Sequence, residues 1–190
     1  VYFPKSPRHL AIDEAKQLVF DARGRVETVC VTVDPDDALA DQIAKDVAPD
    51  FIQLHGAESP ARVAAIKERT GLRVVKAIPV SGPEDVMGAS TYAGIADKIL
   101  FDAKAPAGAD LPGGNGIQFD WRVLSDAPRP FVLSGGLDAD NVQEAIQRSG
   151  ATIVDVSSGV ESSPGVKDAA LIAKFVRAAR ASAPQQKKAS

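Results

Sequence analysis

The sequence has few of the residues that build disulfides, metal sites and membrane anchors. Its 190 residues include one cysteine and two histidines, so no disulfide can form within the chain and a zinc site is not expected. No apolar run approaches the roughly 20 residues that span a membrane. The net charge of −3, with no basic stripe, argues against a general nucleic-acid binder. The first residues resemble no signal peptide. We therefore expect a cytoplasmic protein that works without metal and binds neither nucleic acid nor membrane.

Short apolar segments alternate with helix-like segments along most of the chain. The expected strands begin near Val29, Phe51, Val74, Ile99, Phe131 and Ile153, after the end of a further strand at the first three residues. The expected helices cover residues 9–22, 34–47, 59–70, 82–96, 120–124, 138–148 and 168–181. Strict alternation of this kind predicts a parallel sheet with helical crossovers.

The order of elements favours a (β/α)8 TIM barrel of the α/β class. The strands are apolar throughout, which is typical of strands covered on both faces. A doubly wound open sheet remains an alternative, although no Gly-x-Gly-x-x-Gly follows an early strand. Seven strands, the first cut short, predict a barrel that lacks its first βα unit and the start of its second strand. We expect one domain over residues 1–182 and a disordered tail over 183–190.

The stretch Phe131–Gly159 is the strongest candidate for a binding site. Two successive strands each open into small residues, first Ser134-Gly135-Gly136 and then Ser157-Ser158-Gly159. Glycine lets backbone N–H groups approach an anion closely and reaches positive φ without strain. Such clustered amides next to a helix start suit a phosphate dianion. The alternative is a pair of ordinary turns.

Six motifs, taken in order, resemble the phosphoribosylanthranilate isomerase family of tryptophan biosynthesis, and together they cover nearly the whole chain. They are Phe3-Pro4-Lys5-Ser6-Pro7-Arg8, Gln53-Leu54-His55-Gly56, Phe101-Asp102-Ala103, Gly113-Gly114-Asn115-Gly116 with Phe119-Asp120-Trp121, Leu133-Ser134-Gly135-Gly136-Leu137 with Asn141-Val142, and Asp155-Val156-Ser157-Ser158-Gly159-Val160-Glu161. Asn115 departs from the family, which usually carries threonine there.

The resemblance implies a TIM barrel that performs an Amadori rearrangement without a cofactor. Its substrate would be a phosphorylated aminosugar, N-(5-phosphoribosyl)anthranilate, and the protein would be a monomer, with a dimer possible. Asp102, at the end of an apolar strand, matches the general acid of the family; a helix cap or loop salt bridge is the structural alternative. Arg8 would bind the anthranilate carboxylate. Gly135, Gly136, Ser157, Ser158 and Gly159 would hold the phosphate.

Three other side chains have open or structural interpretations. Asp155 shares a strand face with Ser157, and its partner is either a substrate hydroxyl or Lys76 on another strand. His55 shares a face with Gln53, and a hydrogen-bonded core histidine is favoured over a supporting role in the site. The family's base is a cysteine in a Lys-Ile-Cys-Gly motif that this sequence lacks. Cys30 lies inside a later strand and is expected to be a small buried hydrophobe.

Two other functions compete with this interpretation. One is a related phosphate-binding barrel, such as the sugar isomerase of histidine biosynthesis or a lyase of tryptophan biosynthesis. The histidine enzyme usually has two similar halves, and no half-repeat is evident here. The other is an inactive remnant that retains phosphate binding.

Overall fold

The structure is a computed structural model that describes residues 1–105, 108–109, 113 and 116–182. Six strands form one parallel sheet whose spatial order follows the sequence. These strands are β1 (Val29–Thr32), β2 (Phe51–Leu54), β3 (Arg73–Val80), β4 (Lys98–Ala103), β5 (Val132–Leu133) and β6 (Ile153–Val154). Tyr2 adds a single parallel bridge to Thr32 at the β1 edge. The six expected strands are thus confirmed, and the first three residues, expected to end a further strand, contribute only this bridge.

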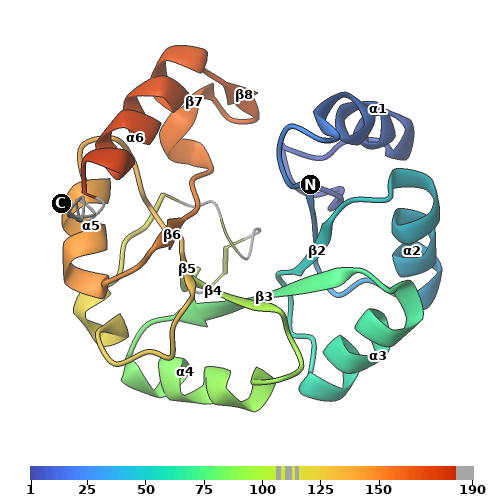
Figure 1. Ribbon diagram of the computed structural model, residues 1–190, viewed down its shortest axis with the longest axis horizontal. Helices are drawn as coiled ribbons and strands as arrows, with labels where there is room; N and C mark the ends of the chain where they lie inside the picture. Colours follow the sequence, from blue (N-terminus) through green and yellow to red (C-terminus); the bar gives the residue numbers. More distant parts are fainter. Residues whose placement is uncertain (106–107, 110–112, 114–115, 183–190) are drawn as a thin grey trace, which may run out of the picture.

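Helices cover the outside of the curled sheet, as Figure 1 shows. The α-helices are α1 (Ile12–Ala22), α2 (Asp37–Gln42), α3 (Pro60–Thr70), α4 (Pro83–Gly88), α5 (Val142–Ser149) and α6 (Ala169–Ala181). Short π or 3-10 segments are η1 (Ile43–Val47), η2 (Ala89–Tyr92), η3 (Trp121–Leu124) and η4 (Ser158–Val160). The fold is an α/β arrangement of the TIM-barrel type, with the strands inside and the helices outside.

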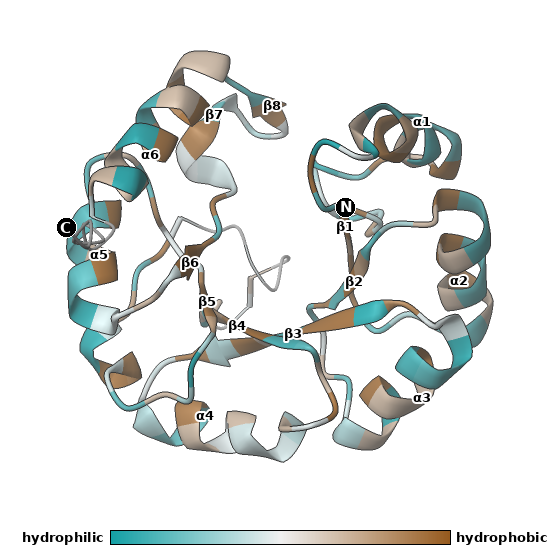
Figure 2. Ribbon diagram, viewed as in Figure 1, coloured by the Kyte–Doolittle hydropathy of each residue, from teal (hydrophilic) through white to brown (hydrophobic). Residues whose placement is uncertain are grey.

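Strand alternation divides the buried side chains into two layers. On β3, Val75 and Ala77 point to the interior of the curled sheet and pack with Phe51. Val74 points the other way and packs with residues of α2 and α3. Figure 2 shows the resulting distribution, with hydrophobic strands at the centre and hydrophilic residues over much of the outer helices. Side chains at every second position of a strand therefore face the interior.

Several elements differ from the sequence-based expectation. The helices expected over 9–22 and 34–47 begin at Ile12 and Asp37, and the one expected over 82–96 ends with η2 at Tyr92. The helix expected over 138–148 begins only at Val142, because Asp138 and Asn141 form a local turn in which each side chain accepts a backbone N–H from the other. An antiparallel hairpin, β7 (Glu161–Ser163) with β8 (Val166–Lys167), was not expected. Its strands are short and mostly polar, so no strand period marks it in the sequence. The tail expected to be disordered, 183–190, lies outside the described residues.

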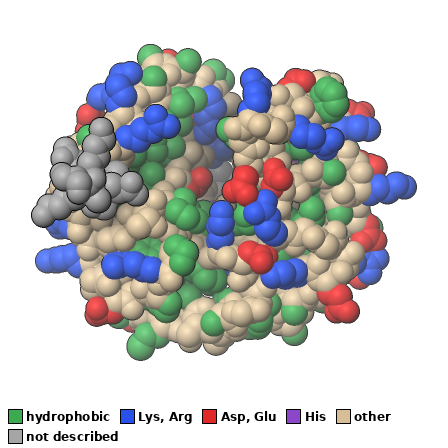
Figure 3. Space-filling model, in the orientation of Figure 1, with side chains coloured by type: hydrophobic (Ala, Val, Ile, Leu, Met, Phe, Trp, Pro, Cys, Tyr) green, Lys and Arg blue, Asp and Glu red, His purple; other side chains and the backbone are tan. Residues whose placement is uncertain are grey.

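The described surface carries both charge signs. Figure 3 shows basic and acidic side chains next to one another near the middle of the visible face, so neither sign forms a continuous patch there. The charged groups of Arg73 on β3 and Lys98 on β4 each lie over the Phe51 ring of β2, at 3.9 and 4.4 Å from its centroid. Within the described residues, none of the helices combines the length and apolar character that crossing a membrane requires.

Candidate active site

A cleft of about 600 Å³ opens where the parallel strands end. Barrels of this type carry their functional residues at this face. The cleft brings together seven of the predicted site residues, namely Arg8, Asp102, Gly135, Gly136, Asp155, Ser157 and Ser158. Gly159 packs directly behind its lining, where a Cβ atom would collide with the carbonyl oxygen of Leu137. The residues chosen from sequence are therefore neighbours in space.

The polar side chains in the cleft lie on the interior face of their strands. Gln53 and His55 continue the alternation that begins with the interior residue Phe51, and Asp102 continues that of Leu100. Ser134 and Asp155 occupy the same face after β5 and β6. These side chains converge because they follow apolar positions on neighbouring strands that are parallel and in register.

Asp102 forms one end of a hydrogen-bonded chain with His55 and Gln53. Its Oδ2 lies 3.1 Å from His55 Nε2, and His55 Nδ1 lies 3.0 Å from Gln53 Oε1. Because the Gln53 oxygen can only accept, the ring donates from Nδ1 in this contact, and Nε2 is left facing the Asp102 carboxyl group. The imidazole therefore joins Gln53 to Asp102 at the cleft. His55 is hydrogen-bonded, as expected, but it lines the cleft and is not enclosed in the core.

Gly113 lies directly over this pair. A Cβ atom there would stand 2.5 Å from Asp102 Oδ2 and 2.7 Å from His55 Nε2, so only glycine leaves room. Asp102 itself is 4% exposed. Residues 114 and 115 of the glycine-rich motif lie outside the described residues.

Asp155 is the second carboxyl group of the cleft. Its Oδ2 accepts a hydrogen bond of 3.0 Å from the Ser134 hydroxyl. Burial raises the pKa of Asp155 above its ordinary value, against the lowering effect of the Ser134 bond, and the nearby Asp102 carboxylate adds to the rise. The alternative that Lys76 pairs with Asp155 is wrong, because Lys76 is bound to Glu58 on the helix side of the sheet.

The two glycine-rich strand ends face each other at one side of the cleft. Gly135 and Gly136 have φ values of +93° and +61°, which residues with a Cβ rarely adopt. A Cβ on Gly135 would also meet the backbone nitrogen of Ala103 at 2.5 Å. Ser157 and Ser158 complete this side of the cleft. Successive amides in such turns form a concave site suited to an anion.

Arg8 lines the cleft, but Glu161 already holds part of its guanidinium. Arg8 Nε and Nη2 donate to the two Glu161 oxygens at 2.7 and 2.8 Å, a bidentate pair across 153 residues of sequence. Lys167 Nζ donates to the same carboxylate at 2.7 Å and to the Ser157 carbonyl at 2.8 Å. The Glu161 pair does not use Arg8 Nη1, which can serve another carboxylate. This partner of Arg8 could not be found from sequence spacing.

Replacing Glu161 with glutamine is expected to change the pH dependence of stability. The Arg8 hydrogen bonds lower the pKa of Glu161 from 4.5 to about 2. A lowered pKa in the folded state stabilises the protein above pH 4.5, and this contribution is lost as pH falls from about 4.5 to about 2. The urea midpoints of wild type and Glu161→Gln should therefore differ at neutral pH and converge as the pH falls through this window. The exposed-site control Glu68→Gln should show no such convergence; a gap of constant size for Glu161→Gln would contradict the assignment.

Cys30 is buried in the core beside Ile52 and Leu54, as expected. Burial raises the pKa of its thiol, which disfavours the reactive thiolate. It does not line the cleft. Among the described residues, no group of three or more His, Cys, Asp or Glu side chains is placed to hold a metal ion.

Comparisons with known proteins point in one direction. The sequence profile of the family described as N-(5'phosphoribosyl)anthranilate (PRA) isomerase matches residues 1–178. An N-(5'-phosphoribosyl)anthranilate isomerase of Brucella canis is 52% identical over 180 residues, which cover 94% of this chain and 81% of the relative. The crystal structure of phosphoribosyl anthranilate isomerase from Thermotoga maritima superposes with a TM-score of 0.83 at 34% identity, over 95% of this chain and 85% of that chain. A structure of such an isomerase in complex with reduced 1-(o-carboxyphenylamino)-1-deoxyribulose 5-phosphate gives 0.80 at 33% identity, over 95% and 84%.

Proposed function

This chain belongs to the N-(5'-phosphoribosyl)anthranilate isomerase family, and on that premise we propose that it converts N-(5'-phosphoribosyl)anthranilate into 1-(2-carboxyphenylamino)-1-deoxyribulose 5-phosphate in tryptophan biosynthesis. One observation carries the proposal: a single cleft holds the Asp102–His55 pair beside two glycine-rich strand ends. Such a cleft can hold a sugar phosphate at one side and deliver a proton to its ring at the other.

The phosphate would lie against Gly135, Gly136, Ser157, Ser158 and Gly159. Backbone N–H groups supply the hydrogen bonds there, and the absence of Cβ atoms at the glycines lets the oxygens approach. Lys167 is close to this side through its bond to the Ser157 carbonyl, and its charge favours an anion. Asp155 is placed to accept hydrogen bonds from sugar hydroxyls, since Ser134 occupies only part of its carboxyl group.

Asp102 would act as the general acid. It donates a proton to the furanose ring oxygen, the C1–O bond breaks, and the anilino nitrogen lone pair forms the C1=N bond of a protonated Schiff base. His55 Nε2 contacts Asp102 Oδ2 and holds the carboxyl group in place, and exchange with solvent returns the proton to Asp102 at the end of the cycle. A base then removes the C2 proton, the electron pair forms the C1=C2 bond of an enolamine, and tautomerisation adds a proton at C1 and leaves the C2 ketone. We assign no residue of the described chain to the base.

Arg8 would bind the anthranilate carboxylate through the part of its guanidinium that Glu161 leaves available. Its loop contains Pro4 and Pro7, which restrict the backbone. Glu161 holds the guanidinium of Arg8, and Lys167 in turn holds the Glu161 carboxylate. The arginine is therefore oriented before substrate arrives. The substrate therefore spans the cleft from Arg8 to the glycine-rich ends.

The direct test is turnover in D₂O. Freshly prepared N-(5'-phosphoribosyl)anthranilate is incubated with the protein, and the product is followed by NMR and mass spectrometry. We expect the aminoketose with deuterium incorporated at C1, because the enolamine is protonated there from solvent. Absence of product above the uncatalysed rate would contradict the proposed function. Product formed only from the corresponding aminoaldose of histidine biosynthesis would replace it with the alternative isomerase.

Replacing Arg8 with alanine should mainly raise KM. A hydrogen bond to a charged group contributes roughly 1.5–3 kcal/mol, so KM should increase about tenfold to a hundredfold while kcat changes little. Steady-state kinetics on Arg8→Ala measure both parameters. The control is Arg122→Ala, whose side chain is 71% exposed and pairs only with Asp120 among the described residues. An unchanged KM in Arg8→Ala would exclude the carboxylate contact.

We also propose that the enzyme works in the cytoplasm, without metal or cofactor, and as a monomer. One solved structure is described as mutually generated monomers of the dimeric phosphoribosylanthranilate isomerase from Thermotoga maritima, so both states are described for that relative. Sedimentation of the purified protein over a range of concentrations distinguishes the two states.

A further inference from the structure

A charged pair with no access to the cleft lies behind His55. Lys76 on β3 and Glu58, just before α3, are 3% and 1% exposed, and Lys76 Nζ lies 2.7 Å from Glu58 Oε2. Neither residue lines the cleft. Because burying two charges is costly, such a pair is weak evidence for a stabilising role. Its contacts indicate a different one.

Lys76 holds the backbone on both sides of His55. Its ammonium group donates to the Leu54 carbonyl at 3.2 Å and to the Gly56 carbonyl at 2.7 Å, besides Glu58. An ammonium group has three N–H donors, so all of them are used. His55 is the residue between the two carbonyls, and its backbone is fixed at both ends.

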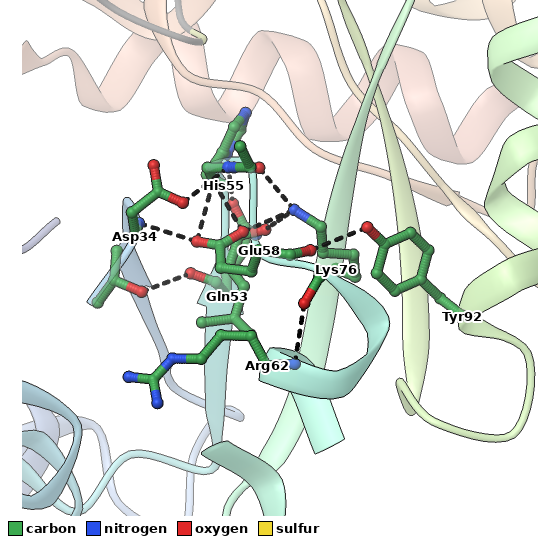
Figure 4. Close-up of polar contacts among 12 residues, drawn as sticks. Asp34, Gln53, His55, Glu58, Arg62, Lys76 and Tyr92 are labelled. Carbon is green, nitrogen blue, oxygen red and sulfur yellow. Dashed lines mark hydrogen bonds and ion pairs between the residues drawn. The ribbon is translucent and has the colours of Figure 1, made fainter. Parts of the chain in front are cut away.

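Glu58 completes the same turn from the other side. Its carboxylate accepts the Gly56 N–H at 3.1 Å and the Asp34 N–H at 2.9 Å. Asp34 in turn accepts the Ala57 N–H at 2.8 Å, and a Cβ on Gly56 would stand 2.5 Å from the Asp34 side chain. The Tyr92 hydroxyl donates to the Glu58 carbonyl at 2.9 Å. Figure 4 shows these side chains converging on the turn that carries His55.

We propose that the Lys76–Glu58 pair is a positioning device that holds the His55 turn so that the imidazole bridges Gln53 and Asp102. Lys76 and Glu58 touch no substrate; they act through the backbone of residues 54–56. Resting on the proposed function, this makes them determinants of proton delivery. Removing them should therefore change the position of the His55 imidazole and lower kcat only when His55 is present. If their role were purely structural, the loss of kcat would not depend on His55.

The first test reads the imidazole directly and needs no turnover. The chain has only two histidines, so ¹⁵N-labelled side chains give two ring systems, with His9 as the internal reference. In wild type we expect His55 to show the tautomer protonated at Nδ1, as its contact with Gln53 Oε1 requires. In Lys76→Met the two His55 nitrogen shifts should move towards each other, and those of His9 should not. Unchanged His55 shifts would overturn the proposal.

The second test is a double-mutant cycle on kcat. Lys76→Met should lower kcat about tenfold in the wild-type background but less than twofold in a His55→Gln background, because the Lys76–Glu58 pair then has no imidazole to position. Equal losses in both backgrounds would indicate a structural role and would refute the proposal. Phe51→Leu, a core change on the interior face of the sheet, controls for lost stability and should leave the His55 signals unchanged.

If Lys76→Met does not fold, the double variant Lys76→Met with Glu58→Gln replaces it. This variant removes both buried charges together, which is far better tolerated than breaking the pair. The same convergence of the His55 nitrogen shifts is expected, and its absence refutes the positioning role. If wild type does not turn over the aminosugar, the proposed function fails while the NMR result still decides the role of the pair.

Discussion

Asp102→Asn is expected to reduce kcat by about 10²–10⁴-fold, the usual contribution of a general acid. The amide keeps the shape of the side chain and can still accept the Ala103 N–H at the Oδ1 position, where the present distance is 2.9 Å. It cannot donate an acidic proton to the ring oxygen. Affinity for the reduced product analogue should stay close to that of wild type, since the binding groups are untouched. Stopped-flow turnover and analogue titration measure the two quantities.

Asp120→Asn is the matched control for this substitution. Asp120 is an exposed carboxylate directly before η3, and its hydrogen bonds from Arg122 lower its pKa to about 2. Its replacement should leave kcat unchanged. A wild-type rate in Asp102→Asn would remove Asp102 from the mechanism. A parallel loss of analogue affinity would show instead that the substitution disturbs the cleft.

Gly159→Ala should weaken both phosphate binding and folding. The added Cβ would collide with the Leu137 carbonyl and approach the Asp138 backbone at 3.1 Å, so the two glycine-rich strand ends must separate. Overpacking of this kind costs about 1–3 kcal/mol, and here backbone must shift. We expect a urea midpoint lowered accordingly and roughly tenfold weaker binding of the phosphorylated product analogue, the equivalent of about 1.4 kcal/mol. Urea titration and calorimetry test the two effects.

Gly88→Ala is the corresponding control. Gly88 lies at the end of α4 with negative φ, and no atom lies within 4 Å of the place that an alanine methyl group would take. Alanine should stabilise the helix by about 0.5–1 kcal/mol and leave analogue affinity unchanged. If Gly159→Ala behaved like Gly88→Ala, the close contact between the strand ends would not matter for binding.

The main strands could be predicted because their signal is local. Segments such as Val29–Thr32 and Phe51–Leu54 are short and mostly apolar, and their parallel pairing follows from helical crossovers. The start of α5 could not be predicted as well. Asp138 and Asn141 carry helix-start chemistry, but their side chains bond to each other's backbone and delay the helix to Val142.

Only part of the candidate site could be predicted from the sequence, because only some of its residues carry a local signal. Asp102 ends an apolar strand, so its place at the cleft follows from local pattern. The bond between His55 and Asp102 joins residues 47 apart, and only the register of β2, β3 and β4 brings them together. The one usable signal in the sequence was that His55 shares a strand face with the polar residue Gln53. The Lys76–Glu58 pair lies on the opposite face of the sheet from Asp155, and sequence alone does not show which face of its strand a residue takes.

The contact between Arg8 and Glu161 has a consequence for the order of folding. The two residues come from opposite edges of the curled sheet, and a Cβ at Gly165 of the same hairpin would stand 2.5 Å from the Pro7 carbonyl. Contacts so distant in sequence form late, since the chain between them must first be ordered. Affinity for an aromatic carboxylate should consequently emerge only in the final refolding phase, after the hydrophobic layers have assembled. On the proposed role of Arg8, binding of the anthranilate group would thus require both edges of the curled sheet to be in place.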